Sequence, residues 1–426
     1  MDVILVEHRG LPIVQLTLYF QGGPAFDPPG REGLTALTNR ALLRGTKRRG
    51  RAELEEAIES LGADLITSTQ TYAVSLGGTV LTRHLPAYLA LLGEVLTEPL
   101  LAADEIEKVK REMLAELEAA RDDDSYLARM WFRRQVFAGH PLGHGGNGSK
   151  ESLSAITPAD VAAHYRRTYC RANLLVGSAG EVDEKTLHGL LADAIGKLPE
   201  GAPLRWALPD PPAREGRRVT LVDKADRSQA QILLGHPTIA AADPAFIPLY
   251  LATTAFGGTF TARLMQEVRV KRGWSYGAYA RLGVERTTGA YMLSAAPSAE
   301  YAVEALGLLL SEYDRFVDEG LDDDEVAFAR DHLIHAFPFS IETAALRAAQ
   351  RVRARLLGRP EDYVETYLAD LAKPTADEVR AAVRRHLTPA DLEVVMVCTA
   401  DAATRAAVAA LPGVTAVEVH SADEPA

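Results

Sequence analysis

The stretch VAAHYRRTYCRANLLV (161–176) matches VRAAVRRHLTPADLEV (379–394) when the chain is aligned with itself so that Val161 meets Val379. The pair Arg166-Arg167 then meets Arg384-Arg385, and LLV (174–176) meets LEV (392–394). Nearly the same shift aligns AADEIEKVKREML (102–114) with DDDEVAFARDHLI (322–334), and RGT (44–46) with GGT (257–259). Repetition on this scale is typical of a duplicated domain. We therefore predict two homologous halves of about 210 residues each.

The segment between the halves has the composition of a linker. LPEGAPLRWALPDPPAREGRR (198–218) contains five prolines and shows no hydrophobic periodicity. Proline-rich stretches of this kind favour an extended connection without helix or strand. We predict an N-terminal domain over 1–205, a linker over 206–217 and a C-terminal domain over 218–426.

The first half combines strand and helix patterns. VILVEH (3–8), VQLTLYF (14–20) and ITSTQTYAVSLGGTVL (66–81) alternate as antiparallel strands do. Helical periodicity follows in RAELEEAIESL (51–61), LPAYLALLGEVL (85–96) and DEIEKVKREMLAELEAA (104–120). These patterns predict the α+β class, with an antiparallel sheet and helices packed on one face in each half. No G-x-G-x-x-G or Walker-type loop occurs, which argues against nucleotide-dependent redox and phosphoryl-transfer enzymes.

Composition excludes further classes of function. The chain of 426 residues carries 46 Lys and Arg against 58 Asp and Glu, a net charge of −12, whereas nucleic-acid binders need a basic surface. Two cysteines rule out a disulfide framework and a four-cysteine zinc site. No run of 18 apolar residues predicts a membrane span. No signal-peptide pattern is visible, so we expect a cytoplasmic protein as the sequence stands, or a periplasmic one if a leader has been removed.

Several segments carry a resemblance to a known family. They are GLTALTNRALLRGTKRR (33–49), GHPLG (139–143), ITPADVAAHYRRTYCRANLLVGSAGEVD (156–183) and FGGTFTARLMQEVRVKRGWSYGAYA (256–280). In this order and spacing they resemble the zinc peptidases related to pitrilysin, insulin-degrading enzyme and mitochondrial processing peptidase. The resemblance runs from Val3 to about Ala400 and implies two homologous α/β-sandwich domains that face each other as a clam shell.

The resemblance fails at the zinc motif. In catalytic members the first segment reads G-x-x-H-x-x-E-H-x-x-x-x-G-T, where the two histidines ligate zinc and the glutamate is the general base. This chain has Ala36, Asn39 and Arg40 at those three positions. Ala36 offers no lone pair, Asn39 cannot accept a proton, and Arg40 brings a fixed positive charge. We therefore predict that this chain contains no metal site and no cofactor of its own.

The family's third zinc ligand is a glutamate, and its position falls on Glu116 in the helical run 104–120. One carboxylate alone does not make a zinc site. Glu116 could equally be an ordinary acid on an acidic helix, or it could form an ion pair with Arg40. The resemblance also places Ile66 where active members have an asparagine on the edge strand that receives substrate.

The second half keeps the family's R-x-x-x-G-x-x-Y signature, with Arg269, Gly273 and Tyr276. In the family the arginine and the tyrosine reach the substrate carbonyl and the oxyanion, a role that suits a guanidinium and a phenol. Alternatively, Arg269 belongs to a solvated basic helix and Tyr276 only begins a strand. Gly257 and Gly258 allow the close approach of a substrate backbone, or they form a tight connector.

Three other polar clusters are less specific. His332 and His335 could share a helix face, but without a neighbouring acid or cysteine we interpret them as a polar surface. His140 and His144 belong to the family's H-P-x-G turn, which indicates a structural loop. The acids from Asp322 to Glu325 are typical of a helix start, and their spacing does not fit a calcium loop.

The resemblance implies a role in proteolysis without catalysis by this chain alone. A homologous partner that carries the zinc motif would supply zinc and the general base, and would form a heterodimer with this chain around peptide substrates. This chain would supply Arg269 and Tyr276. A homodimer in isolation stays open. The alternative is a structural member of the same fold with no peptidase role.

Overall fold

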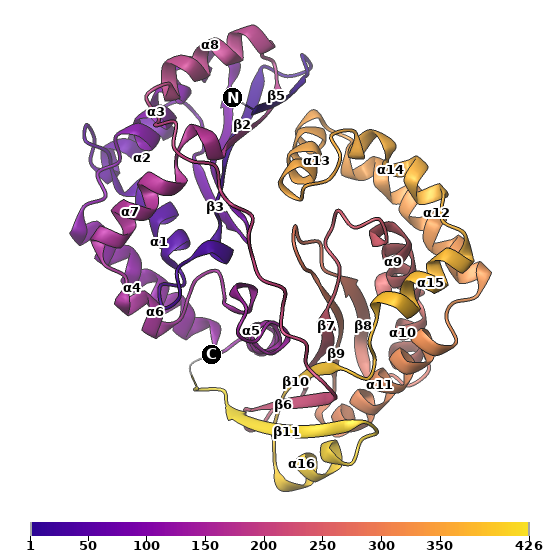
Figure 1. The fold of residues 1–426 in the computed structure, drawn as a ribbon. Helices are drawn as coiled ribbons and strands as arrows, with labels where there is room; N and C mark the ends of the chain where they lie inside the picture. Colours follow the sequence, from indigo (N-terminus) through magenta and orange to yellow (C-terminus); the bar gives the residue numbers. More distant parts are fainter. Residues whose placement is uncertain (1, 425–426) are drawn as a thin grey trace. The chain divides into compact units, whose positions relative to one another are not determined.

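The computed structural model describes residues 2–424, which fold into two compact units that each combine a sheet with helices (Figure 1). The first unit contains the chain up to Glu118 and, in addition, His144–Ala207 and Phe339–Leu356. The second contains Ala119–Gly143, Leu208–Pro338 and the chain from Leu357 onward. The predicted α+β class with two homologous domains is confirmed. The units are interleaved along the chain, whereas the predicted domains 1–205 and 218–426 are continuous.

The first unit is built on a five-stranded sheet with the order β1-β5-β2-β4-β3. Its strands are β1 (Asp2–Glu7), β2 (Ile13–Gln21), β3 (Ile66–Gln70), β4 (Ala73–Leu81) and β5 (Leu174–Gly180). The second unit has a six-stranded sheet with the order β11-β6-β10-β7-β9-β8. Its strands are β6 (Arg217–Asp223), β7 (Gln231–Pro237), β8 (Ser275–Leu282), β9 (Ala290–Pro297), β10 (Leu392–Cys398) and β11 (Val414–Ser421). Apart from the added β11, the two strand orders are the same, as the predicted duplication requires.

The pairing of the strands corrects one expectation. The sheets are mixed, because β1 pairs with β5 in parallel and β6 pairs in parallel with both β10 and β11. The other pairs are antiparallel, as predicted. Strand alternation in the sequence reports which face a residue takes, but the direction of pairing depends on how the chain returns to the sheet.

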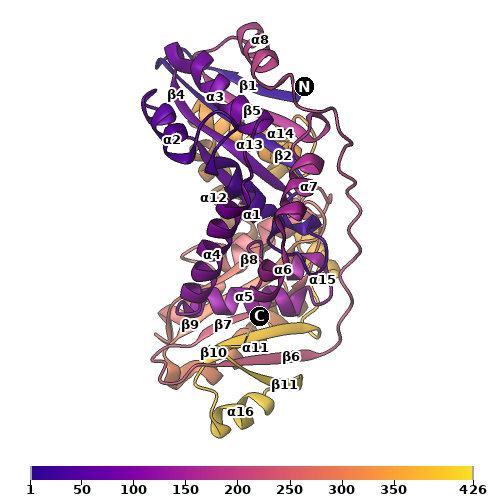
Figure 2. The same cartoon turned by 90° about the vertical axis from the view of Figure 1, so that its left-hand side faces the viewer.

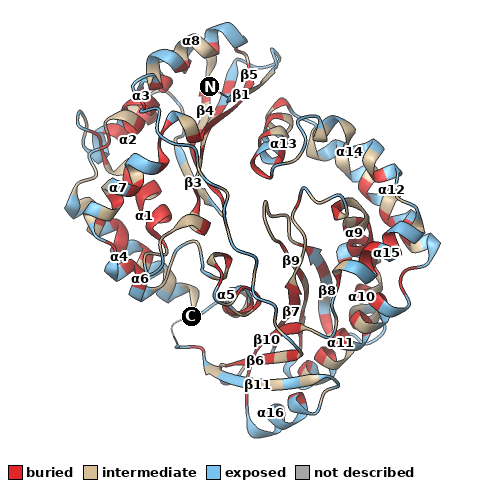
Figure 3. Ribbon diagram, in the orientation of Figure 1, coloured by how far each residue is buried: buried red, intermediate tan, exposed pale blue. Residues whose placement is uncertain are grey.

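Helices of the first unit pack in two clusters. Side chains of α2 (Arg51–Glu59), α3 (Leu85–Thr97) and α8 (Glu184–Ile195) form one core with the sheet. A second core joins α1 (Leu34–Ala41), α4 (Ala103–Ala120), α6 (Lys150–Ala155) and α7 (Pro158–Thr168). Along most of these helices buried residues alternate with exposed ones (Figure 3), as expected for amphipathic helices at a surface.

Helices of the second unit cover its sheet in the same way. They are α9 (Phe246–Thr253), α10 (Arg263–Met265), α11 (Ala302–Asp318), α12 (Asp323–Ser340), α14 (Tyr363–Ala372), α15 (Ala376–His386) and α16 (Ala402–Ala409). Buried side chains of α9, α11, α15 and strand β10 belong to one large core. The hydrophobic run of β10 is buried over its whole length.

Two helices correct the prediction that helices pack on one face only. Helix α5 (Asp124–Val136) comes from the N-terminal half but packs on β7 and β10 of the second unit. Helix α13 (Ala344–Leu356) comes from the C-terminal half but packs on β1 and β5 of the first unit, where Val352 contacts Leu175. The alignment that matches 102–114 with 322–334 also places these two helices on each other. We call this arrangement the helix exchange.

The segment between α8 and β6 has neither helix nor strand over residues 196–216 (Figure 2). Its proline-rich composition explains the lack of regular structure. Within residues 2–424, no helix is long and apolar enough to cross a membrane.

Candidate functional site

Helix α1 carries the three positions of the lost zinc motif, and a buried acid fixes where this helix begins. Gly33 precedes α1 with a φ of +93°, a conformation that favours glycine. Asp27 accepts hydrogen bonds from the backbone N–H of Gly33 at 2.9 Å and of Thr35 at 3.0 Å. Burial raises the pKa of Asp27 to about 6, against the opposing effect of these hydrogen bonds.

The general-base position is occupied by an amide with a full set of partners. Asn39 is buried, and its Nδ2 donates to Ser68 O at 2.9 Å and to Thr69 Oγ1 at 3.2 Å. Its Oδ1 accepts from the hydroxyl of Tyr169 at 3.0 Å. Asn39 therefore joins α1 to edge strand β3, and both of its polar atoms already have partners within the chain. Its neighbour Ala36 lies in the apolar core of α1 and α4.

The ion pair between Arg40 and Glu116, left open by the sequence, is present. Arg40 Nη1 lies 2.8 Å from Glu116 Oε1. A second ion pair joins Arg44, in the 3-10 turn after α1, to Glu112, one turn before Glu116 on α4. The guanidinium of Arg40 therefore forms an ion pair with Glu116, the carboxylate at the position of the family's third zinc ligand.

These residues do not fit a zinc ion. Ala36 has no ligand atom, the amide of Asn39 is engaged on both sides, and Arg40 places a cation against Glu116. Throughout residues 2–424, no group of three His, Cys, Asp or Glu side chains is arranged to hold a metal ion. Ile66, where active members have an asparagine, lies on β3 with 60% of its surface exposed.

The remaining histidines and acids have structural surroundings. His332 stacks on Phe328. Within residues 2–424, neither His332 nor His335 belongs to a group of three side chains that could hold a metal ion. His140 Nδ1 accepts from the N–H of Leu142 at 3.1 Å, and its Nε2 lies 2.8 Å from Pro209 O, so the H-P-x-G turn holds the linker. His144 lies 3.8 Å from Glu32.

The acids from Asp322 to Glu325 begin α12, as predicted. Asp322 accepts from the N–H of Glu325 at 2.7 Å, and the side chain of Glu325 accepts in return from the N–H of Asp322 at 3.0 Å. This reciprocal pair caps the helix start.

In the second unit, Arg269 lies in a π-helical turn (Gln266–Val270) directly after α10. Its guanidinium carbon is 4.3 Å from the centroid of the Phe260 ring, a cation–π contact. Glu267 pairs with Lys271 and Arg272, and the bond from Lys271 is the main reason why the pKa of Glu267 lies below its ordinary value. Arg269 itself has no ion pair or hydrogen bond to any described side chain. Its donors are therefore available to a ligand.

Tyr276 is exposed for 85% of its surface near the start of edge strand β8. A β-bulge interrupts the pairing of β8 with β9 between Ser275 and Ala278. The hydroxyl of Ser275 stabilises this bulge, because it donates to Gly277 O at 2.8 Å and accepts from the N–H of Ala296 at 3.2 Å. Bulges redirect side chains at the edge of a sheet, and here the redirected side chain is the tyrosine.

The two glycines before this segment differ in their surroundings. A Cβ on Gly257 would come within 2.4 Å of Ala280 N, so the close packing of this turn on β8 requires glycine there. A Cβ on Gly258 would meet only the side chain of Thr254, at 3.3 Å. The connector interpretation accounts for Gly257, and the role of Gly258 in substrate binding stays a prediction.

Some residues of these sites could not be found from the sequence. Tyr169, Ser68 and Thr69 hold Asn39 from distant segments, and no motif marks them. Phe260 lies in the glycine-rich turn, and no motif indicates that its ring contacts Arg269.

Comparison with known proteins identifies the family. Residues 3–145 match the model described as insulinase (peptidase family M16), and residues 155–333 match the model described as peptidase M16 inactive domain. An uncharacterized zinc protease of Streptomyces coelicolor is 26% identical over 85% of this chain and 80% of its own length. A protein of Helicobacter pylori named non-peptidase homolog YmxG is 25% identical over 92% of this chain and 90% of its own length.

A solved structure agrees with these matches. The crystal structure of a peptidase M16 inactive domain from Pseudomonas fluorescens superimposes with a TM-score of 0.86 at 25% identity, and covers 94% of this chain and 96% of the other. The site described above explains why the zinc chemistry of the family is lost here, since Ala36, Asn39 and Arg40 replace both ligands and the base. The chain therefore belongs to the insulinase family of peptidases, family M16, as an inactive member.

Proposed function

We propose that this chain is the non-catalytic subunit of a two-subunit zinc-dependent peptidase. A homologous partner with an intact zinc motif would supply the metal ion and the general base. Arg269 would donate to the substrate carbonyl, and Tyr276 would donate to the oxyanion that forms when the carbonyl is attacked. Donors placed in advance at a developing negative charge are among the strongest contributions to catalysis.

One observation carries this proposal. The polar groups at the lost zinc site are all engaged within the chain, whereas Arg269 and Tyr276 are left without polar partners in the described structure. A protein that kept the fold only as a scaffold would have no reason to hold a guanidinium on an aromatic ring and a phenol on a bulge. The geometry supports a donor pair prepared for a ligand.

The experiment is co-expression with a homologue that carries His-x-x-Glu-His, sought in the same genome. We expect a heterodimer on size-exclusion chromatography, and peptidase activity that neither chain has alone. Zinc measured by elemental analysis should follow the partner and not this chain. If the two chains never associate, or if association brings no activity, the shared-site proposal is wrong.

A scaffold without any peptidase role is the second candidate. It is favoured by the similarity to the Helicobacter pylori protein named non-peptidase homolog. This candidate predicts that an assembled complex keeps its full activity when Arg269 and Tyr276 are replaced. The same co-expression system therefore distinguishes the two candidates.

A further inference from the structure

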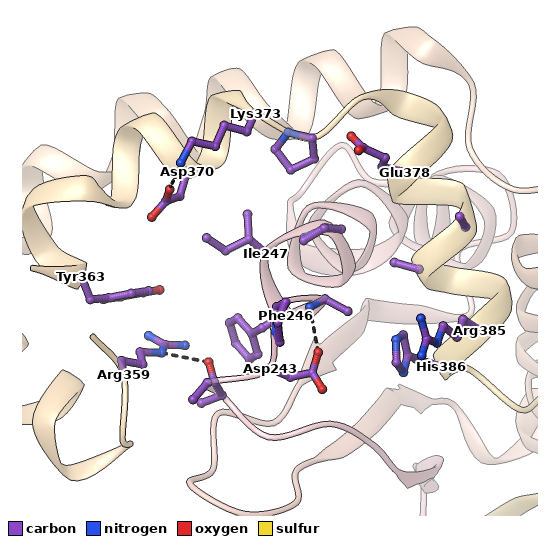
Figure 4. Close-up of a pocket in the computed structure, with 18 of the residues that line it drawn as sticks. Asp243, Phe246, Ile247, Arg359, Tyr363, Asp370, Lys373, Glu378, Arg385 and His386 are labelled. Atoms are coloured by element: carbon purple, nitrogen blue, oxygen red, sulfur yellow. Dashed lines mark hydrogen bonds and ion pairs between the residues drawn. The ribbon is translucent and has the colours of Figure 1, made fainter. Parts of the chain in front are cut away.

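A cavity of about 790 Å³ opens in the second unit among the start of α9, the segment before α14, and α15 (Figure 4). Its volume lies in the range of small-ligand sites. No residue from Arg269 to Tyr276 lines it, so it is separate from the proposed donor pair. Charged, aromatic and apolar side chains line it, among them Asp243, Phe246, Ile247, Arg359, Ala382 and Arg385.

The duplicated position in the first unit is filled by the chain itself. The alignment of 161–176 with 379–394 places Ala382 at His164 and Arg385 at Arg167. The buried ring of His164 lies 3.2 Å from Thr35 Oγ1 and 3.2 Å from Arg167 Nη2. Thr35 in turn donates to Asp27 Oδ1 at 2.5 Å, and the charge of Arg167 favours the ionised form of that acid. Arg167 therefore contacts the buried ring of His164 and acts on Asp27 only through its charge, because no ion pair joins the two in the described chain.

In the second unit the imidazole ring is missing at the equivalent position. Ala382 leaves open the volume that an imidazole fills in the first unit. The three acids that line the cavity are engaged elsewhere: Asp243 accepts from the N–H of Ala245 at 2.8 Å, Asp370 pairs with Lys373 at 2.7 Å, and Glu378 accepts from Thr375. Arg385 is exposed and forms no ion pair or hydrogen bond within the described chain. In Figure 4 Arg385 lies with His386 at one end of the cavity, and Asp243, the acid labelled at that end, is bonded to the N–H of Ala245, so no carboxylate pairs with Arg385 within the described chain.

The rest of the cavity is apolar and stiff. In Figure 4, Phe246 and Ile247 lie between Arg385 at one end and Tyr363 with Arg359 at the other. The guanidinium of Arg359 packs on the rings of Phe246 and Tyr363, at 4.7 and 4.2 Å, and its Nε donates to Ala241 O at 3.1 Å. Side chains that are already fixed lose little entropy when a ligand binds.

We propose that this cavity binds the C-terminal residue of a peptide. The terminal carboxylate would pair with Arg385, which has no ion pair of its own in the described chain. An apolar last side chain would pack on Phe246 and Ile247. Guanidinium–carboxylate pairs are strong and directional, and capture of a free C-terminus is a known mode of peptide recognition. The cavity would thus anchor peptide ends at a place separate from Arg269 and Tyr276, whether or not a partner chain is present.

The test uses the full chain and a fluorescent hexapeptide of alanines ending in leucine, with binding followed by anisotropy. We expect the peptide with a free carboxylate to bind at least about tenfold more tightly than the same peptide amidated at its C-terminus, as for the loss of a charged hydrogen bond. Arg385→Ala should weaken binding by about tenfold or more. The matched control is Arg384→Ala, which removes an exposed arginine from the same end of α15 but does not line the cavity, and should change binding less than twofold.

A second variant tests the cavity without touching the arginine. Ala382→His introduces the residue that the first unit has at the equivalent position, His164. We expect the larger side chain to fill part of the cavity and to weaken peptide binding by about tenfold. Thermal unfolding shows whether each variant is folded. Equal binding of the free and amidated peptides, equal effects of the two arginine variants, or no binding at 1 mM peptide would each reject the proposal. If octanoate binds as tightly as the peptide, the cavity takes aliphatic carboxylates in general, and the assignment to peptide ends is wrong.

Discussion

The two units share one strand order but differ in what they do with their polar groups. In the first unit Asn39, Arg40 and Arg167 are each bonded to side chains or backbone of the same unit. In the second unit Arg269 and Arg385 have no such partners in the described structure. The two units are copies of one framework, and the polar groups at the zinc-motif positions of the first unit form internal contacts. The comparison shows that the second unit has two arginines whose donors are not used by side chains of the described structure.

The largest expected effect concerns Tyr276. In a reconstituted complex with a zinc-motif homologue, Tyr276→Phe should lower kcat by about 10²–10³, because it removes one oxyanion donor and keeps the ring. Arg269→Lys should also lower kcat, since an ammonium lacks the planar fork of the guanidinium. Steady-state kinetics on purified heterodimer measures both.

Arg40→Ala in the same complex is the control from the first unit, and its kcat should be unchanged. Heterodimer formation must be intact for all variants. If Tyr276→Phe and Arg269→Lys keep full kcat while Arg40→Ala lowers it, the first unit contributes to catalysis and the second does not.

The next largest expected effect is on the pH dependence of stability, and it concerns two acids whose pKa values are raised by burial. Asp27 in the first unit accepts three hydrogen bonds, whereas both carboxylate oxygens of Glu393, on β10 in the second unit, lack a hydrogen bond. Arg214 Nε lies 3.1 Å from Glu393, yet burial dominates and raises the pKa of Glu393 to about 7.

Because this pKa is raised above its value of about 4.3 in the unfolded chain, the protonated form favours the native state. The stabilising effect is complete below about pH 4, decreases as the pH rises toward 7, and is lost above that. The stability of the wild type relative to Glu393→Gln should therefore fall by roughly 2–3 kcal/mol between pH 4 and pH 7. Urea unfolding across this range measures it, and parallel curves for the two proteins would contradict the assignment.

Asn39 should matter for stability rather than activity. Asn39→Ala leaves the buried hydroxyl of Tyr169 without its partner and removes the bond to the carbonyl of Ser68, at a cost of about 1–3 kcal/mol. The matched control is Asn147→Ala, which alters an exposed side chain and should change stability by less than about 0.5 kcal/mol. Equal destabilisation by both would show that the amide of Asn39 has no special role.

The smallest effect belongs to the ion pair that occupies the zinc position. Glu116 is about half exposed, so Arg40→Ala should cost no more than about 1 kcal/mol, and less at high salt. Chemical unfolding at low and high ionic strength tests this. A loss of several kcal/mol would mean that the pair replaces the metal as a major support of the unit.

Much of this architecture was predictable from the sequence. Repeats such as 161–176 over 379–394 predicted the duplicated framework, and the family spacing placed Arg40 beside Glu116. The helix exchange was not predictable, because the periodicity of α5 and α13 shows that one side of each helix is buried but not which sheet covers it. The partners of Asn39 were also hidden, since they come from distant segments of the chain, on β3 and directly after α7.

The helix exchange has a consequence for how the gene could have arisen and how the chain can be cut. The chain passes between the units after Glu118, Gly143, Ala207, Pro338 and Leu356. A single proteolytic cut at the linker would leave two fragments that each contribute to both cores, so the nicked protein should stay together. Splitting the gene at the same place would give two products that complete each other only as a pair. The ancestor of the duplicated chain is then best understood as a domain-swapped dimer, in which each subunit packed one helix on the sheet of the other before the two genes were fused.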